Sequence, residues 1–97
     1  MNKRNHQYRI TVTHLESAKE SAPIQPELQI DIENHDDIFA VIEKIQQKQL
    51  FDDPQQATEF GLGLKLFSEV LLKNRKHPLF DEFYPAFGDF MKKLKSQ

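Results

Sequence analysis

The sequence predicts an α+β fold in which an N-terminal antiparallel hairpin packs on about three helices. Two short segments near the start alternate apolar and polar residues, which is the period of a strand with one buried face. Later segments repeat apolar residues every three or four positions, which is typical of amphipathic helices. A chain of 97 residues provides one hydrophobic core. We therefore expect a single domain over residues 1–97, ordered from about residue 7 to residue 95.

The hairpin is predicted from two alternating segments. Their apolar residues are Tyr8, Ile10 and Val12 in the first strand and Leu28, Ile30 and Ile32 in the second. Residues 17–26 between them are rich in Ser, Ala and Pro, so we expect a long, mobile loop there. Placing Ile10 opposite Ile30 brings Arg9 opposite Asp31 on the polar face. A lone hairpin is marginal in water, so we expect the helices to cover its apolar face.

The first helix is predicted to follow the second strand and to end near Gln49. Asn34 is a suitable capping residue, and Asp36 and Asp37 suit the positive end of the helix. Apolar residues then recur at helical spacing, at Ile38, Val41, Ile42 and Ile45.

A second helix is predicted to begin after Asp53, because Pro54 suits the first helical position and Gln56 can complete a capping box. One stripe of this helix is apolar, at Ala57, Phe60, Leu64, Phe67 and Leu71. The opposite face mixes apolar and charged residues, at Leu62, Lys65, Leu66, Glu69 and Lys73. Gly61 and Gly63 lie inside the helix, where glycine is unfavourable, so we expect a neighbouring element to approach closely at both.

The last segment is predicted to be helical after Pro78, which should end the second helix. A second aromatic stripe follows, at Phe80, Phe83, Phe87, Phe90 and Leu94. Pro85 interrupts it, so we expect either a kinked helix from Leu79 or a short turn and then a helix starting near Pro85. Phenylalanines at this spacing are usually core residues.

Composition limits the classes of function. The chain has no cysteine, which excludes disulfides, thiolate metal sites and cysteine nucleophiles and suits a cytoplasmic location. Polar His6 and Gln7 stand where a signal peptide needs apolar residues, and no run is long enough to span a membrane. The net charge of −2 is unevenly distributed, because residues 16–59 are strongly acidic and both ends of the chain are basic. Such segregation either steers a partner or attracts the ends of the fold to its middle.

Catalytic candidates are weak. The run His35-Asp36-Asp37 contains groups that bind divalent metals, but adjacent residues at a helix start point in different directions. We interpret this run as a helix start and expect no metal, cofactor or catalytic residue. The four serines lack the glycine-flanked turn of a serine nucleophile. A small metal-dependent enzyme therefore ranks third among the functions we consider.

The basic segment at the end of the second helix is our candidate partner-binding site. It consists of Lys73, Asn74, Arg75 and Lys76. Arg75 offers bidentate contacts, and Asn74 suits either recognition or helix termination. Such residues also complement a helix dipole, and Arg75 has possible internal partners in the acidic segment. Phosphate binding by Lys73, Arg75 and Lys76 makes a nucleic-acid-associated protein the second hypothesis, although a pI near 6.1 is unlike that of most such proteins.

Self-association is predicted from two features. A two-stranded sheet leaves free edges, and Leu62 and Leu66 lie away from the main apolar stripe of their helix. A twofold dimer would bury both. The alternative is that the segment around Phe80, Phe83 and Pro85 folds back over these leucines and leaves a monomer.

Three blocks of the chain resemble a small bacterial family of single-domain proteins of unknown function. The blocks are Asn34-His35-Asp36-Asp37-Ile38-Phe39, Gly63-Leu64-Lys65-Leu66-Phe67, and Leu72-Lys73-Asn74-Arg75 followed by Pro78-Leu79-Phe80. The resemblance extends from about Tyr8 to Lys95 and implies a bacterial α+β protein. It implies no activity. The residues themselves favour a non-enzymatic module that binds an unidentified protein.

Overall fold

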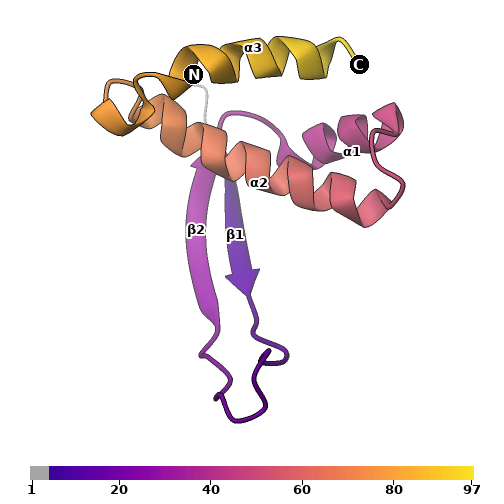
Figure 1. The fold of residues 1–97 in the computed structure, drawn as a ribbon, viewed down its shortest axis with the longest axis vertical. Helices are drawn as coiled ribbons and strands as arrows, with labels where there is room; N and C mark the ends of the chain where they lie inside the picture. Colours follow the sequence, from indigo (N-terminus) through magenta and orange to yellow (C-terminus); the bar gives the residue numbers. More distant parts are fainter. Residues whose placement is uncertain (1–4) are drawn as a thin grey trace. The chain divides into compact units, whose positions relative to one another are not determined.

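The computed structural model describes residues 5–97, and this part of the chain forms a two-stranded hairpin followed by helices (Figure 1). The elements are β1 (His6–Val12), β2 (Leu28–Asn34), α1 (Ile38–Lys48), α2 (Pro54–Lys73), the 3₁₀ helix η1 (Pro78–Phe80) and α3 (Phe83–Lys95). The predicted α+β arrangement of a hairpin and three helices is confirmed. The chain divides after Asp36 into two compact units, which we call the hairpin unit and the helical unit (Asp37–Gln97).

The hairpin has the register that its alternating pattern predicts. β1 and β2 pair antiparallel, with Ile10 opposite Ile30 and Arg9 opposite Asp31. The guanidinium of Arg9 donates two hydrogen bonds to the Asp31 carboxylate, from Nε to Oδ1 at 2.8 Å and from Nη2 to Oδ2 at 3.2 Å. These bonds hold the pKa of Asp31 below its ordinary value and raise the pKa of Arg9.

Three of the six apolar residues on one face of the hairpin are exposed. Val12, Leu28 and Ile30 are 54%, 56% and 44% exposed, whereas the three other apolar residues of this face are half-buried. Coverage of this face by the helices stays a prediction.

Side-chain hydrogen bonds tie together the base of the long loop. Thr13 Oγ1 donates to Glu27 Oε1 at 2.9 Å. The imidazole of His14 accepts a bond from the backbone N–H of Gln25 at Nδ1 and donates one from Nε2 to the carbonyl of Glu16. The loop therefore has local structure on both sides of its tip, and the mobility of residues 17–26 stays a prediction.

The capping residue of the first helix lies three residues later than the sequence suggests. Asp37, and not Asn34, caps α1, because its carboxylate accepts a bond from the backbone N–H of Ala40 at 3.2 Å. Asn34 is fully buried at the end of β2, and its Oδ1 accepts a bond from the backbone N–H of Asp36. Asn34 therefore shapes the turn that precedes the helix. The end of α1 at Gln49, in a left-handed conformation, matches the prediction.

Helices α1 and α2 pack against each other through small and branched side chains. Asp53 caps α2 by accepting a bond from the backbone N–H of Gln55, and Pro54 occupies the first turn as predicted. The buried apolar residues of the two helices are Ile38, Ile45, Ala57, Leu64 and Leu71. Gly61 is buried among them, where an added Cβ would lie 3.0 Å from Cγ1 of Ile42 and 3.3 Å from Cδ1 of Ile45. The expected close approach is therefore confirmed at Gly61.

Two expectations about α2 are wrong. An added Cβ at Gly63 would meet nothing within 4 Å, so no neighbour explains this glycine. Lys65, expected on the mixed face of the helix, is only 8% exposed. Ser68 is buried as well, so the buried face of α2 includes polar positions that a hydrophobic stripe cannot reveal.

The last segment follows the second of the two arrangements that Pro85 allowed. A short turn at η1 precedes α3, and α3 begins at Phe83, two residues before the proline. Pro85 therefore lies in the first turn, where a backbone N–H has no intrahelical partner and its absence costs little.

The two glycines of α2 predict opposite responses to alanine. Gly63→Ala should raise the free energy of unfolding by about 0.5–1 kcal/mol, because alanine favours the helix and meets no neighbour. Gly61→Ala should gain less or destabilise, because its methyl group presses on Ile42. Denaturant unfolding of both variants measures the difference, and equal effects would contradict the packing at Gly61.

The Arg9 and Asp31 pair predicts a pH effect of defined sign. Arg9→Ala should raise the pKa of the Asp31 carboxyl, because its strongest hydrogen-bond donor is lost. Since the folded pKa lies below the unfolded one, the pair stabilises the hairpin above the unfolded pKa, and this contribution is lost as pH falls through the folded value. An NMR titration of the Asp31 carboxyl carbon in both proteins measures the shift. Identical titration curves would show that the pair does not persist in solution.

Candidate functional site

The run His35-Asp36-Asp37 forms a helix start. His35 Nε2 lies 3.5 Å from Asp36 Oδ2, while the carboxylate of Asp37 turns back to cap α1. No group of three or more His, Cys, Asp or Glu side chains is placed to hold a metal ion within residues 5–97. The capping bond of Asp37 supports the interpretation of this run as a helix start.

The residues of the basic segment at the end of α2 fall into two groups: one ends the helix, and three are exposed. Asn74 ends the helix: its backbone N–H bonds to the carbonyls of Val70 and Leu71, and its side-chain Nδ2 donates to the Val70 carbonyl at 2.8 Å. Lys73, Arg75 and Lys76 are exposed. In the part of the chain that the structure describes, Arg75 forms no ion pair, so the internal partner considered for it is not observed.

The leucines proposed for self-association lie midway along α2. Leu62 and Leu66 are both half-buried. Val70, one turn beyond Leu66 on the same row, is 52% exposed. Self-association through Leu62 and Leu66 stays a prediction.

An apolar groove lies along α2 and α3 in the helical unit. It consists of two hollows of about 300 and 420 Å³ that share Phe90, and we call them together the phenylalanine groove. The first hollow is lined by Leu64, Phe67, Phe83, Ala86, Phe87 and Phe90. The second is lined by Leu50, Phe51, Phe60, Phe90, Lys93, Leu94 and Gln97. Figure 1 shows α3 running alongside α2. Phenylalanine rings from both helices line the two hollows.

Aromatic contacts hold the groove in shape. The ring of Phe67 on α2 makes edge-to-face contacts with Phe83 and Phe87 on α3, with centroids 5.8 and 6.1 Å apart. The ring of Phe60 meets Phe90 at 6.3 Å and Phe51 at 5.6 Å, again edge to face. Such pairs stabilise beyond the area they bury, because ring edges are positive and ring faces negative. The rings therefore serve as the packing between α2 and α3.

The groove is open to solvent, which corrects the interpretation of these phenylalanines as core. Phe67, Phe83 and Phe90 are 42%, 43% and 44% exposed, and α3 contributes no fully buried residue. The sequence alone does not reveal this, because a stripe of phenylalanines has the same spacing whether its partner covers it fully or partly. One feature of the sequence did indicate that some large apolar residues lack cover: α2 is apolar on more than one side.

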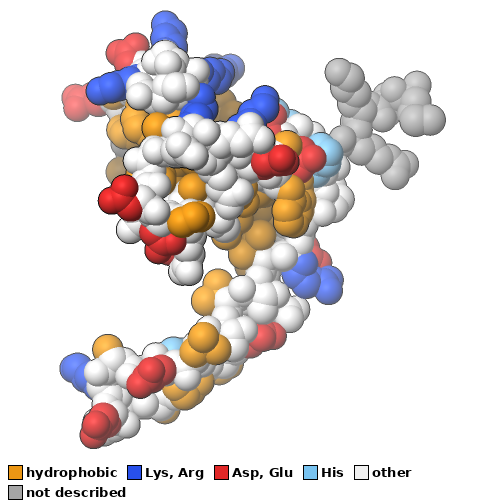
Figure 2. All heavy atoms as spheres, turned by 90° about the vertical axis from the view of Figure 1, so that its right-hand side faces the viewer, with side chains coloured by type: hydrophobic (Ala, Val, Ile, Leu, Met, Phe, Trp, Pro, Cys, Tyr) orange, Lys and Arg blue, Asp and Glu red, His pale blue; other side chains and the backbone are white. Residues whose placement is uncertain are grey.

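One end of the groove is cationic. Lys93 has the only ionisable side chain among the residues lining the two hollows, and Lys92 and Lys95 accompany it in the last turn of α3. In Figure 2, basic side chains gather near the top of the helical unit, close to apolar side chains that remain visible at the surface. The groove thus combines an apolar floor with a positive margin.

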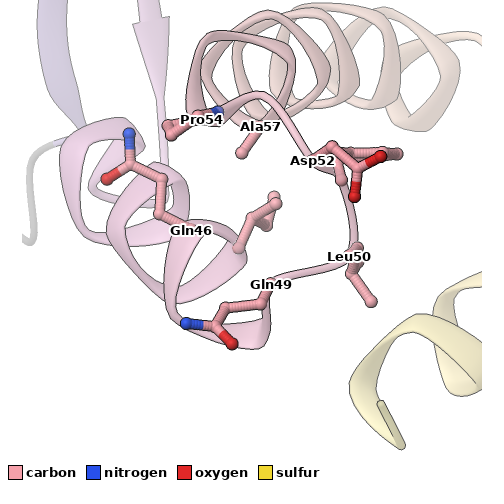
Figure 3. Close-up of a pocket in the computed structure, with 8 residues that line it drawn as sticks. Gln46, Gln49, Leu50, Asp52, Pro54 and Ala57 are labelled. Atoms are coloured by element: carbon pink, nitrogen blue, oxygen red, sulfur yellow. The ribbon is translucent and has the colours of Figure 1, made fainter.

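A further hollow lies where α1 passes into α2, and it offers less chemistry. It has a volume of about 400 Å³, and Figure 3 places Gln46 and Asp52 on opposite sides of it. The amide of Gln46 already donates to Thr58 Oγ1 at 3.1 Å. One of the three polar side chains that line this hollow is therefore already engaged in a hydrogen bond.

No helix in residues 5–97 combines the length and apolarity needed to cross a membrane. This finding agrees with the absence of long apolar runs in the sequence.

Comparison with known proteins identifies the family. A model of DUF3861, described as a domain of unknown function with a solved structure, matches residues 6–96. The chain belongs to this family, so the resemblance to a small family of unknown function is confirmed. The match spans nearly all of the chain and includes both units.

A solved relative has the same fold. It is a protein of unknown function from Pectobacterium atrosepticum SCRI1043, with a crystal structure at 2.20 Å resolution. The two sequences are 41% identical, the alignment covers 97% of this chain and 100% of the relative, and the TM-score is 0.81. No curated protein matches the chain. The comparisons therefore assign a family and a bacterial relative but no activity.

Proposed function

We propose that this protein is a non-enzymatic protein-interaction module that binds a partner in the phenylalanine groove. The observation that carries the proposal is the exposure of large aromatic side chains in two hollows of the helical unit that share Phe90. Small monomeric proteins rarely leave such rings open, because each one in contact with water costs free energy that burial against a partner recovers. Phenylalanine also suits the centre of protein interfaces.

Both units belong to the proposed module. The family match extends from residue 6 to residue 96, which supports treating residues 1–97 as one domain. The lack of cysteine supports a cytoplasmic location. The exposed Lys73, Arg75 and Lys76 remain a candidate second contact, and a homodimer through Leu62 and Leu66 remains an alternative form of the same kind of function.

Site-specific photo-crosslinking tests the groove. A photoreactive phenylalanine analogue in place of Phe83, inside the groove, should yield discrete adducts with a partner in bacterial cells. The same analogue in place of Phe39 is the matched control, because Phe39 is 73% exposed and lies outside the groove. A second substitution, Phe90→Asp, should abolish the adducts from position 83, because a carboxylate cannot be buried unpaired at the groove centre.

One further measurement makes the crosslinking result decisive. Circular dichroism should show that Phe90→Asp keeps its helical signal, since the side chain is 44% exposed. Adducts that form equally from positions 39 and 83, or that persist in folded Phe90→Asp, would show that the groove does not bind the partner. The absence of adducts from position 83 would contradict the proposal as well.

Nucleic-acid binding is the second candidate, and the lack of an ion pair at Arg75 in the described residues favours keeping it. If Lys73, Arg75 and Lys76 contact phosphates, binding should weaken steeply with salt, and replacing all three by alanine should reduce the logarithmic salt slope by about 3. Replacing Lys92, Lys93 and Lys95 by alanine removes the same charge elsewhere and is the control. Titrations with duplex DNA, single-stranded DNA and RNA measure both effects. Equal losses in the two triple variants would show only a nonspecific charge effect.

A further inference from the structure

We propose that the phenylalanine groove binds an amphipathic α-helix of a partner protein, and that this helix carries carboxylates at the end that meets Lys93. The inference rests on the proposed function and deepens it, because it states the conformation and the charge of the bound segment. Three properties of the groove support it: walls formed mostly by helices, its length, and the position of its charge.

The walls of the groove favour a helical occupant. They are formed by α2, α3 and the turn before α2, and the backbone groups inside a helix are already hydrogen-bonded. Among the lining side chains only Lys93 and Gln97 carry polar groups. An extended β-strand segment would therefore bury carbonyl and N–H groups without partners. A helix satisfies its own backbone and presents only side chains.

The length of the groove sets the length of the occupant. On α3 the lining residues run from Phe83 to Leu94, a rise of about 16 Å at 1.5 Å per residue. A bound helix of about three turns covers that distance. Its apolar anchors should recur at i, i+4, i+7 and i+11, which places them on one face.

The lysine at one end of the groove determines which charge the bound helix should carry at that end. Docking removes water from Lys93, and a cation that loses water without gaining an anion is unfavourable. Lys92 and Lys95 add positive potential at the same end. Asp52 and Asp53 stand beyond Phe51 in the turn before α2, but Asp53 is engaged in capping and neither lines the groove. A carboxylate on the partner is therefore the complementary group.

Two synthetic peptides test the charge requirement. Each has sixteen residues with leucine at the four anchor positions, and the terminal turns carry glutamate in one and lysine in the other. Fluorescence anisotropy should show that the glutamate peptide binds at least about fivefold more tightly, since exposed ion pairs contribute modest amounts each. The difference should shrink as salt rises.

Matched protein variants assign the effect to the groove. Lys93→Glu should remove or reverse the preference for the glutamate peptide, whereas Lys44→Glu, which makes the same charge change outside the groove lining, should leave it. Phe90→Asp should abolish binding of both peptides. These outcomes together support the inference.

Several results would overturn it: equal affinity for the two peptides, no binding of either one, or the same loss in Lys93→Glu and Lys44→Glu. Light scattering that shows a dimer dissolved by Phe90→Asp would also overturn it, because the groove would then hold a second copy. Photo-crosslinks at position 83 that disappear in Phe90→Asp would still support the proposed function, so the two failures are distinguishable.

Discussion

The close contact between α1 and α2 at Gly61 determines how the rest of the helical unit is arranged. Because Ile42 approaches the helix where a Cβ would stand, the narrow face of α2 is occupied by α1. The larger side chains of α2, Phe60 and Phe67, point to another side and meet the rings of α3. Aromatic rings separate helices more widely than small residues do, so α3 lies against α2 through rings and leaves an open groove. A bulkier residue at position 61 would alter all of these contacts together.

Several titratable groups of this chain have structural roles in the described fold. An active site needs titratable side chains that converge on one reacting position. Here the carboxylate of Asp37 caps a helix, His14 ties a loop, and the pair whose pKa values shift, Arg9 and Asp31, is a solvent-exposed contact on the hairpin. In each case the local geometry gives a structural reason for the group. The groove, in contrast, has a large apolar surface for which the described fold provides no cover.

The sequence predicted what depends on local signals and failed where distant residues decide. The hairpin register follows from a period of two, because shifting it by one residue would exchange the two faces. The start of α2 follows from Asp53 and Pro54, which act within one turn. The burial of Lys65 and the half-exposure of Phe90 depend instead on which elements surround those residues, and spacing does not contain that information. Asn34 and Asp37 are both suitable capping residues for α1. Asp37 is the cap because β2 extends to Asn34.

The contacts among the rings of the groove also reduce the side-chain entropy that is lost on binding. A flexible apolar surface loses side-chain freedom when a partner docks, and this loss weakens association. Phe67 and Phe90 are already held by edge-to-face contacts, Phe67 with Phe83 and Phe90 with Phe60. Phenylalanine has only two side-chain torsions, so fixing it in advance removes most of that cost. A surface of long flexible residues with equal area would bind less well. The contacting rings of the groove are therefore positioned before a partner docks, whereas Lys93 at the margin is exposed.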